Sequence, residues 1–286
     1  MAPLNKVSRR GILIALLAPP SAPVIDTHTH FYDPTRPQGV PWPAPAEKAL
    51  YRRVLPPEFV ALSRPHGVRA TIVVEASPWV EDNQWVLDLA KEHAVIAGLV
   101  GHLNPGESGF REQLARFRKN PLFLGIRLGG DALAKGMATQ VVEDLRRLAD
   151  EGLQVDLLGG PSMLAGVVQL ARAVPELRIV IDHVPFDTPA GPTLAALREY
   201  PRVYAKVSGR TTDTAALDDL WHVFGEDRLI YGSNWPVSER VAPYGRIFGT
   251  VHSYFAAKGD AALRKYMWAN ALAAYRCRIR DEMAIP

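Results

Sequence analysis

The sequence predicts an α/β fold, a (β/α)8 TIM barrel with one extra helix near the C-terminus. Short runs rich in Val, Ile and Leu alternate along the chain with amphipathic segments, which is typical of a parallel sheet covered by helices. Eight such units within 286 residues match the size of a barrel. A doubly wound open sheet usually has a Gly-rich phosphate turn after its first strand, and no GxGxxG occurs here. We therefore expect the barrel.

Eight strands are expected between the N-terminal region and residue 233. Each is a short apolar run bounded by Gly, Pro or polar residues. The expected strands cover residues 24–30, 70–76, 95–103, 122–128, 153–158, 178–184, 202–209 and 228–233.

Helical periodicity fills the segments between these strands. Apolar residues recur every three or four positions in 81–93, 109–120, 138–152 and 162–174. Gly152 and Pro175 stand where two of these helices would end. A further apolar stripe at 260–276 is expected to pack on its own domain, at the bottom or the side of the barrel. Residues 34–57 hold seven prolines and no periodicity, so we expect a long loop on the catalytic face.

The composition indicates one globular domain, residues 23–286. Apolar residues make up 48% of the chain, and 33 basic residues nearly balance 30 acidic ones without any basic run. Nucleic acid is therefore not an expected partner. The one cysteine, Cys277, excludes an internal disulfide and a Cys-based zinc site. No stretch reaches the roughly 18 apolar residues that a membrane span needs. A small molecule is the expected partner, and the oligomeric state is not readable from the sequence.

Residues 1–22 are expected to be either an N-terminal tail or an export signal. The Ser-Arg-Arg at 8–10, followed by a short apolar run at 12–18, resembles a twin-arginine signal. The apolar run is at the short end of the usual range, and Pro20 occupies the third position before a cut at Ala22. A cytoplasmic and a periplasmic location both remain open.

A ladder of polar residues lies on the first expected strand. Residues 24–31 read VIDTHTHF, and alternate side chains of a strand share a face, so Asp26, His28 and His30 point the same way. Polar residues seldom fill a buried strand face without a function. Asp26 lies roughly 6–7 Å deeper than His28, so it is expected to orient an imidazole. We expect a functional site here.

Polar residues also end most of the other strands. Reacting groups of barrel enzymes lie at the C-terminal ends of strands. The strand-end residues are His28, His30, Glu75, Arg127, Asp182, His183, Lys206, Ser208, Ser233, Asn234 and Trp235. Asp182 is expected to point away from His183, because a regular strand alternates its faces. His102, after the third strand, is expected to be structural because Asn104 and Pro105 turn the chain behind it.

Five motifs together carry a family resemblance. VIDTHTHFYDP, GIRL, VIDHVPF, AKVSG and IYGSNWPV occur in this order at strand ends, over residues 23–275. This combination resembles the amidohydrolase-related barrel hydrolases, in particular the lactonase-like branch with its sugar-lactone and pyrone-dicarboxylate hydrolases. The resemblance implies a hydrolase that uses activated water to open a lactone or similar cyclic ester of a sugar acid or an aromatic-derived acid.

The resemblance also implies roles for single residues. His28, His30 and His183 would hold one divalent metal, zinc or similar, or face the substrate carbonyl without a metal; the family contains both kinds of enzyme. Arg127 would bind a substrate carboxylate or hydroxyl, and Lys206 would polarise the carbonyl or balance charge.

The strand-eight motif departs from the family pattern. The family usually reads GSDWP, with the Asp as general base on water, whereas this chain reads GSNWP. The Asn234 amide cannot take a proton from water, and as a metal ligand it offers only a neutral oxygen. Glu75 is therefore the expected base, with a histidine as the other candidate. Asn234 would hold water or substrate by hydrogen bonds.

Three tryptophans lie on expected rim loops. Trp42, Trp79 and Trp235 can stack on a substrate ring or pack within their loops, and we assign Trp235 to substrate binding.

Two other functions remain open at this stage. A metal-dependent decarboxylase of the same superfamily shares the His-x-His strand but also relies on the strand-eight Asp. A catalytically inactive barrel that binds a sugar acid or aromatic acid would explain Asn234 directly. Release of carbon dioxide would indicate the first function, and tight binding without turnover the second.

Overall fold

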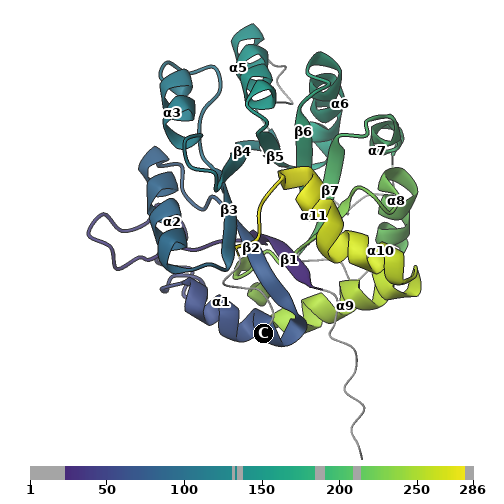
Figure 1. Ribbon diagram of the computed structural model, residues 1–286, viewed down its shortest axis with the longest axis horizontal. Coiled ribbons are helices and arrows are strands. Elements are labelled where there is room, and N and C mark those ends of the chain that lie inside the picture. The colour runs from purple at the N-terminus through teal and green to yellow at the C-terminus, as the bar shows by residue number, and fades with distance from the viewer. Residues whose placement is uncertain (1–22, 131–132, 134–137, 184–190, 209–213, 281–286) are drawn as a thin grey trace, which may run out of the picture.

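Eight parallel strands form the centre of the molecule, in the order β1 to β8 around a ring (Figure 1). The computed structural model describes residues 23–280 apart from 131–132, 134–137, 184–190 and 209–213. The first and last strands are joined by backbone hydrogen bonds, from His30 N to Trp235 O and from Asn234 N to His28 O, both 2.9 Å. The predicted barrel is confirmed.

The strands lie close to their predicted positions. Each begins and ends within two residues of the expected range. They are β1 (Val24–Thr29), β2 (Val68–Val74), β3 (Ile96–Gly101), β4 (Phe123–Gly129), β5 (Gln154–Leu158), β6 (Arg178–Asp182), β7 (Val203–Ser208) and β8 (Leu229–Gly232).

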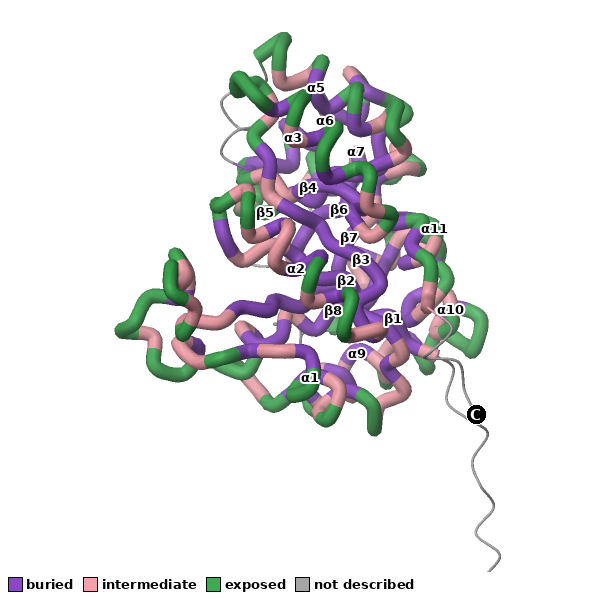
Figure 2. The backbone as a smooth tube through the Cα atoms, turned by 60° about the vertical axis from the view of Figure 1, so that its left-hand side comes forward, coloured by how far each residue is buried: buried purple, intermediate pink, exposed green. Residues whose placement is uncertain are grey.

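Helices surround the strands, with their apolar sides toward the ring. In Figure 2 the central strands are buried and the exposed residues lie on the outer helices and loops. The α-helices are α1 (Pro56–Ser63), α2 (Val80–Glu92), α3 (Phe110–Phe117), α5 (Thr139–Asp150), α6 (Leu164–Ala173), α7 (Pro192–Ala196), α8 (Thr214–Phe224), α9 (Tyr244–Ala257), α10 (Asp260–Arg264) and α11 (Asn270–Tyr275). The four predicted helices correspond to α2, α3, α5 and α6. In the part of the chain that the structure describes, no helix is long and apolar enough to cross a membrane.

The C-terminal helix closes the N-terminal end of the barrel. The segment predicted as one helix at 260–276 is α10, a π-helical turn at Lys265–Ala269, and α11. Residues of α11, among them Ala274 and Tyr275, join the apolar cluster inside the barrel. Arg178, the first residue of β6, donates from Nε to the carbonyl of Ala274 over 2.6 Å. The C-terminal ends of the strands are therefore the open end.

A long loop follows β1 and runs beside α2 (Figure 1). It is held at both ends, because Tyr32 pairs with Val54 and its hydroxyl donates to Leu50 O over 2.9 Å. Within it, Arg36 forms an ion pair with Asp82 of α2, with 3.0 Å between Nη1 and Oδ1. The expected loop is thus a fixed wall next to the open end.

Candidate active site

A pocket of about 410 Å³ opens at the C-terminal ends of the strands. It lies where barrel enzymes carry out their chemistry. Its described lining residues come from the ends of seven strands, all but β7, and from the β1 loop. They are His30, Trp42, Glu75, Ala76, Ser77, Pro78, His102, Arg127, Leu158, His183, Asn234 and Val237. Five of the predicted site residues thus meet in one cavity: His30, Glu75, Arg127, His183 and Asn234.

Three imidazoles meet at the base of this pocket. The ring centre of His28 lies 4.9 Å from that of His30 and 4.3 Å from that of His183. His28 is fully buried beneath the other two. Nδ1 of His30 is 2.9 Å from the carbonyl oxygen of Val74, which can only accept, so Nδ1 carries the proton. Burial, with the nearby Arg127 charge, lowers the pKa of His30 to about 3, so its ring is neutral near pH 7.

The chain leaves the strand conformation at His183. Its φ of 48° is left-handed, and its Nδ1 lies 2.5 Å from the hydroxyl of Ser208 on β7. Because regular alternation stops here, Asp182 and His183 both reach His28, with 3.4 Å from Asp182 Oδ1 to His28 Nδ1. The expectation that Asp182 points away from the site is wrong.

Glu75 and Arg127 form an ion pair across the pocket wall. Arg127 donates from Nε to Glu75 Oε1 over 2.8 Å and from Nη2 to the Glu75 carbonyl over 2.7 Å. The two side chains are only 15% and 13% exposed, respectively. Two hydrogen bonds to one residue fix the guanidinium plane and the carboxylate together. Among the described lining residues, Glu75 is the one carboxylate.

Asn234 occupies a tight turn after β8. Its φ of 58° is left-handed, a conformation that Asn tolerates better than most residues. Its backbone N–H donates to the carbonyl of His28, and its carbonyl accepts from the N–H of Ser238, both at 2.9 Å. These bonds fix the backbone, so the amide side chain is presented to the pocket.

Lys206 was predicted to contact substrate, but it lies below the pocket. It is fully buried, and its Nζ is 2.6 Å from Asp156 Oδ2, 2.9 Å from Asp182 Oδ1 and 3.3 Å from His28 Nδ1. Carboxylates from β5 and β6 hold the ammonium inside the barrel. A direct substrate contact is not what this arrangement provides.

Trp235 is also placed away from the pocket. The indole is fully buried, its N–H donates to Glu239 Oε1 over 3.0 Å, and its ring packs against Phe31 and Phe59. The predicted substrate contact is therefore not provided by this residue either. Of the three rim tryptophans, Trp42 lines the pocket.

Asp26 has a different task from the one expected. Its Oδ1 accepts from the backbone N–H groups of His28 and Ser233, at 3.2 and 2.8 Å, and its Oδ2 accepts from the hydroxyl of Tyr244 at 3.1 Å. Asp26 thus ties β1 to the end of β8 and does not orient an imidazole. Burial raises its pKa to about 6, although these hydrogen bonds oppose the shift.

Two polar residues gain importance in the structure. His102, expected to be structural, lines the pocket, and Asn83 fixes its backbone through bonds of 2.8 and 2.9 Å. The position of His102 directly after β3 is the sequence feature that could have identified it as a pocket residue. Asp156 lies within an apolar strand, where no sequence pattern distinguishes it, but a buried carboxylate needs a partner. That partner is Lys206, fifty residues along the chain.

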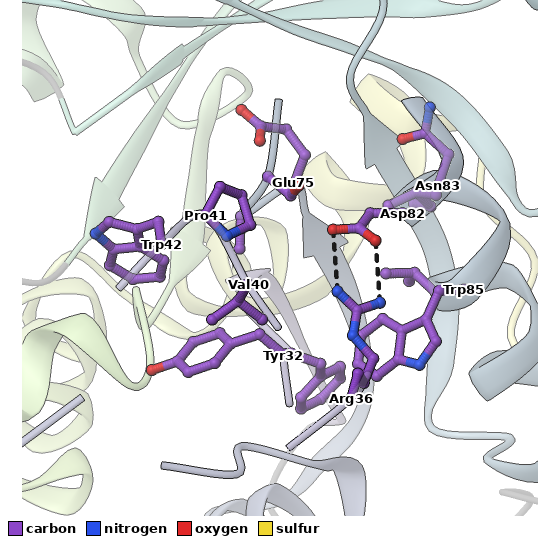
Figure 3. A pocket seen from close by; sticks show the side chains of 14 residues that line it. Tyr32, Arg36, Val40, Pro41, Trp42, Glu75, Asp82, Asn83 and Trp85 are labelled. Carbon is purple, nitrogen blue, oxygen red and sulfur yellow. Dashed lines mark hydrogen bonds and ion pairs between the residues drawn. The ribbon is translucent and has the colours of Figure 1, made fainter. Parts of the chain in front are cut away.

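A second, much smaller cavity of about 20 Å³ adjoins the pocket under the β1 loop. Figure 3 shows Trp42, Pro41 and Glu75 on its wall and the ion pair of Arg36 with Asp82 beside it. The Arg36 guanidinium also lies 4.6 Å from the ring centre of Trp85. These contacts fix the loop that carries Trp42 into the main pocket.

The three imidazoles are the candidate ligands for a divalent metal. The part of the chain that the structure describes contains no group of three or more His, Cys, Asp or Glu placed to hold a metal ion. The Lys206 ammonium lies 3.3 Å from Nδ1 of His28 and adds a positive charge beside this ring. The arrangement therefore does not fit a divalent ion.

A barrel with imidazoles, a carboxylate–guanidinium pair and an amide at its open end has the architecture of a barrel hydrolase. Comparisons with known proteins agree. The Amidohydrolase family matches residues 25–277, so the chain belongs to that family. This membership confirms the predicted family and enzyme class.

Two curated relatives and one solved structure are similar over most of their length. An L-fucono-1,5-lactonase of Burkholderia ambifaria is 31% identical over 77% of this chain and 83% of its own. An L-fucono-1,5-lactonase of Burkholderia multivorans is 26% identical over 91% and 97%. A crystal structure of an amidohydrolase from Burkholderia multivorans, with bound zinc, has a TM-score of 0.79 at 25% identity over 90% and 100%. These similarities support the predicted class, a lactone-opening hydrolase, and a divalent metal in at least one relative.

Proposed function

We propose that this protein is a lactonase that opens an uncharged sugar lactone with activated water and without a metal. The observation that carries the proposal is the pocket itself, in which the one described carboxylate and the one described guanidinium neutralise each other. The similarity to two L-fucono-1,5-lactonases supports it.

The charge of the pocket favours a neutral substrate. A dicarboxylate, such as a pyrone dicarboxylate, needs unpaired cationic groups to replace the water around its charges. Arg127 already binds Glu75 through two hydrogen bonds. A polyhydroxylated lactone instead needs a few donors and acceptors and an apolar surface for its ring. His102 and Asn234 offer the polar groups, and Trp42 offers the surface.

Glu75 is the proposed general base. It is the one carboxylate among the described lining residues, and Arg127 holds it in a fixed orientation. His30 is a poor base because its pKa is lowered to about 3 by burial. Water held near the Glu75 carboxylate would lose its proton to an oxygen of Glu75 as it attacks the lactone carbonyl carbon. His183 is the second candidate, because it also lines the pocket.

The negative charge that develops on the carbonyl oxygen needs donors that are already in place. The amide of Asn234 and the guanidinium of Arg127 are fixed by backbone and side-chain contacts, so they require no reorganisation during the reaction. Collapse of the tetrahedral species breaks the ring C–O bond, and the ring oxygen takes up the proton that Glu75 received from water, which yields a hydroxyl and restores the Glu75 carboxylate.

The predicted metal is not part of this proposal. A zinc ion is bound in one solved relative, but the donors here do not form a metal site, and Asn234 replaces the carboxylate of the family motif. Decarboxylation is disfavoured for the same reason, because that chemistry relies on the metal and the strand-eight Asp. A purely binding barrel is the alternative that the experiment below also tests.

The test is acid release, followed with a pH indicator, from neutral aldonolactones and from a pyrone dicarboxylate, with and without chelator. We expect hydrolysis of neutral lactones, unaffected by chelator. Loss of activity with chelator would contradict the metal-free mechanism, and preference for the dicarboxylate would contradict the substrate class. A folded protein that binds lactones without turnover would indicate a binding barrel.

A further inference from the structure

A chain of buried polar groups runs from the closed end of the barrel to the imidazoles. The hydroxyl of Tyr275 in α11 donates to Asp156 Oδ2 over 3.0 Å. Lys206 Nζ donates to the same oxygen over 2.6 Å and lies 2.9 Å from Asp182 Oδ1 and 3.3 Å from His28 Nδ1. All five side chains are almost inaccessible to solvent. The proposed lactonase mechanism assigns no role to Tyr275, Asp156 or Lys206.

Asp156 depends on two donors. Both bonds reach Oδ2, and Oδ1 has no hydrogen-bond partner within the described residues. A buried carboxylate with so few donors is held only by them. If the Tyr275 hydroxyl is removed, Lys206 becomes the sole donor, and Asp156 draws the ammonium toward itself. The position of Lys206 is thus a balance between Asp156 on one side and Asp182 on the other.

The position of Lys206 decides where the proton of His28 lies. An ammonium can only donate, so Nδ1 accepts from Lys206 and the ring carries its proton on Nε2. If Lys206 moves away, Asp182 Oδ1 at 3.4 Å becomes the partner of Nδ1, which must then carry the proton itself. The two arrangements present opposite functions, donor or acceptor, at Nε2. That atom is buried and has no partner within the described residues.

We propose that Tyr275 is a positioning residue for the active site: its hydroxyl fixes Asp156, which places Lys206 against His28 and holds that imidazole in the Nε2–H form. The ring of His28 packs against His183 and His30, which line the pocket. A helix at the closed end of the barrel therefore acts on the open end. Only the kinetic part of the test rests on the proposed lactonase function.

The chain offers a matched control for the test. Tyr266, in the π-helical turn that precedes α11, is also a fully buried tyrosine, and its hydroxyl donates to the carbonyl of Val207 over 3.1 Å. Tyr275→Phe and Tyr266→Phe each remove one buried hydroxyl that makes one hydrogen bond. They should lower the free energy of unfolding to a similar degree, but only Tyr275 contacts Asp156.

The first measurement is the ¹⁵N spectrum of the histidine rings at pH 8, where Asp156, with its pKa raised to about 7 by burial, carries its charge. In the unaltered protein His28 should show a protonated Nε2. We expect Tyr275→Phe to shift His28 toward a protonated Nδ1, and Tyr266→Phe to leave it unchanged. Unaltered His28 signals in Tyr275→Phe, or equal shifts in both variants, would overturn the proposal.

The second measurement is steady-state lactone hydrolysis. Tyr275→Phe should lower kcat about tenfold with KM within about twofold, since one hydrogen bond is lost outside the pocket. Tyr266→Phe should keep kcat within about twofold. An undiminished kcat in Tyr275→Phe would overturn the proposal. If no lactone is hydrolysed by the unaltered protein, the NMR result alone decides the positioning role and the proposed function fails separately. Should Tyr275→Phe not fold, Asp156→Asn is used with the opposite expectation: without the Asp156 charge, Lys206 stays with Asp182 and His28, so His28 should keep its protonated Nε2. A shift of His28 to a protonated Nδ1 in Asp156→Asn would overturn the proposal.

Discussion

Two ion-pair systems lie only a few side chains apart in this barrel and differ in their access to water. Glu75 and Arg127 lie on the pocket wall, 15% and 13% exposed. Lys206, Asp156 and Asp182 lie beneath the imidazoles with no exposure at all. The first system can contact a substrate directly, whereas the second can act only through the groups that it holds. The polar groups near the strand ends are thus of two kinds. Those on the pocket wall can react with a substrate, and those beneath the imidazoles can only position other side chains.

The depth also changes what each system contributes to stability. A partly exposed pair is screened by water and adds little to the free energy of unfolding. A fully buried ammonium between two carboxylates makes each partner indispensable, because removal of one leaves an uncompensated charge. Although burial acts to raise it, the Lys206 ammonium holds the pKa of Asp182 well below its usual range. We therefore expect substitutions on the pocket wall to lower activity, and substitutions beneath the imidazoles to lower the free energy of unfolding.

Glu75→Gln should give the largest effect on activity. The amide keeps an oxygen for the Nε bond of Arg127 but cannot take a proton, so kcat should fall by about 10²–10⁴-fold. The unfolding free energy should change little. Glu81→Gln is the matched control, because Glu81 forms an ion pair with Arg116 on the exposed surface between α2 and α3. Retained kcat in Glu75→Gln would transfer the base role to His183.

Lys206→Met should give the largest loss of stability. Removal of the ammonium leaves Asp156 and Asp182 buried without compensation, so the unfolding free energy should fall by about 3–5 kcal/mol. Urea denaturation measures this loss. Lys258→Met, which removes a lysine paired with the exposed Asp218, should leave stability almost unchanged. Equal, small losses in both variants would contradict the separation by depth.

Asp26→Asn should give a smaller, pH-dependent effect. The pKa of Asp26 is raised to about 6 in the folded state, so its protonated form favours folding. Its contribution is complete below the unfolded pKa near 4 and is lost as the pH rises through 6. Between pH 5 and 7.5 the unaltered protein should lose about 1 kcal/mol more stability than Asp26→Asn. Parallel pH curves in urea denaturation would contradict this assignment.

The sequence alone determined the barrel and much of its open end. Apolar strand runs and helical periodicity placed every strand within two residues, because both patterns are local. The rule that reacting groups follow parallel strands brought five predicted residues into one pocket, including His30 and Arg127. The same rule also applies to His102, which follows β3 and is a sixth residue of this pocket.

Depth and direction of side chains were decided only by the tertiary structure. Alternation along a strand predicted that Asp182 points away, but the left-handed backbone of His183 ends the alternation. Lys206 and Trp235 were expected in the pocket; carboxylates from β5 and β6 draw the first inward, and Phe31 and Phe59 enclose the second. Burial and charge compensation depend on partners far along the chain, such as Asp156 and Tyr275, which no local pattern contains.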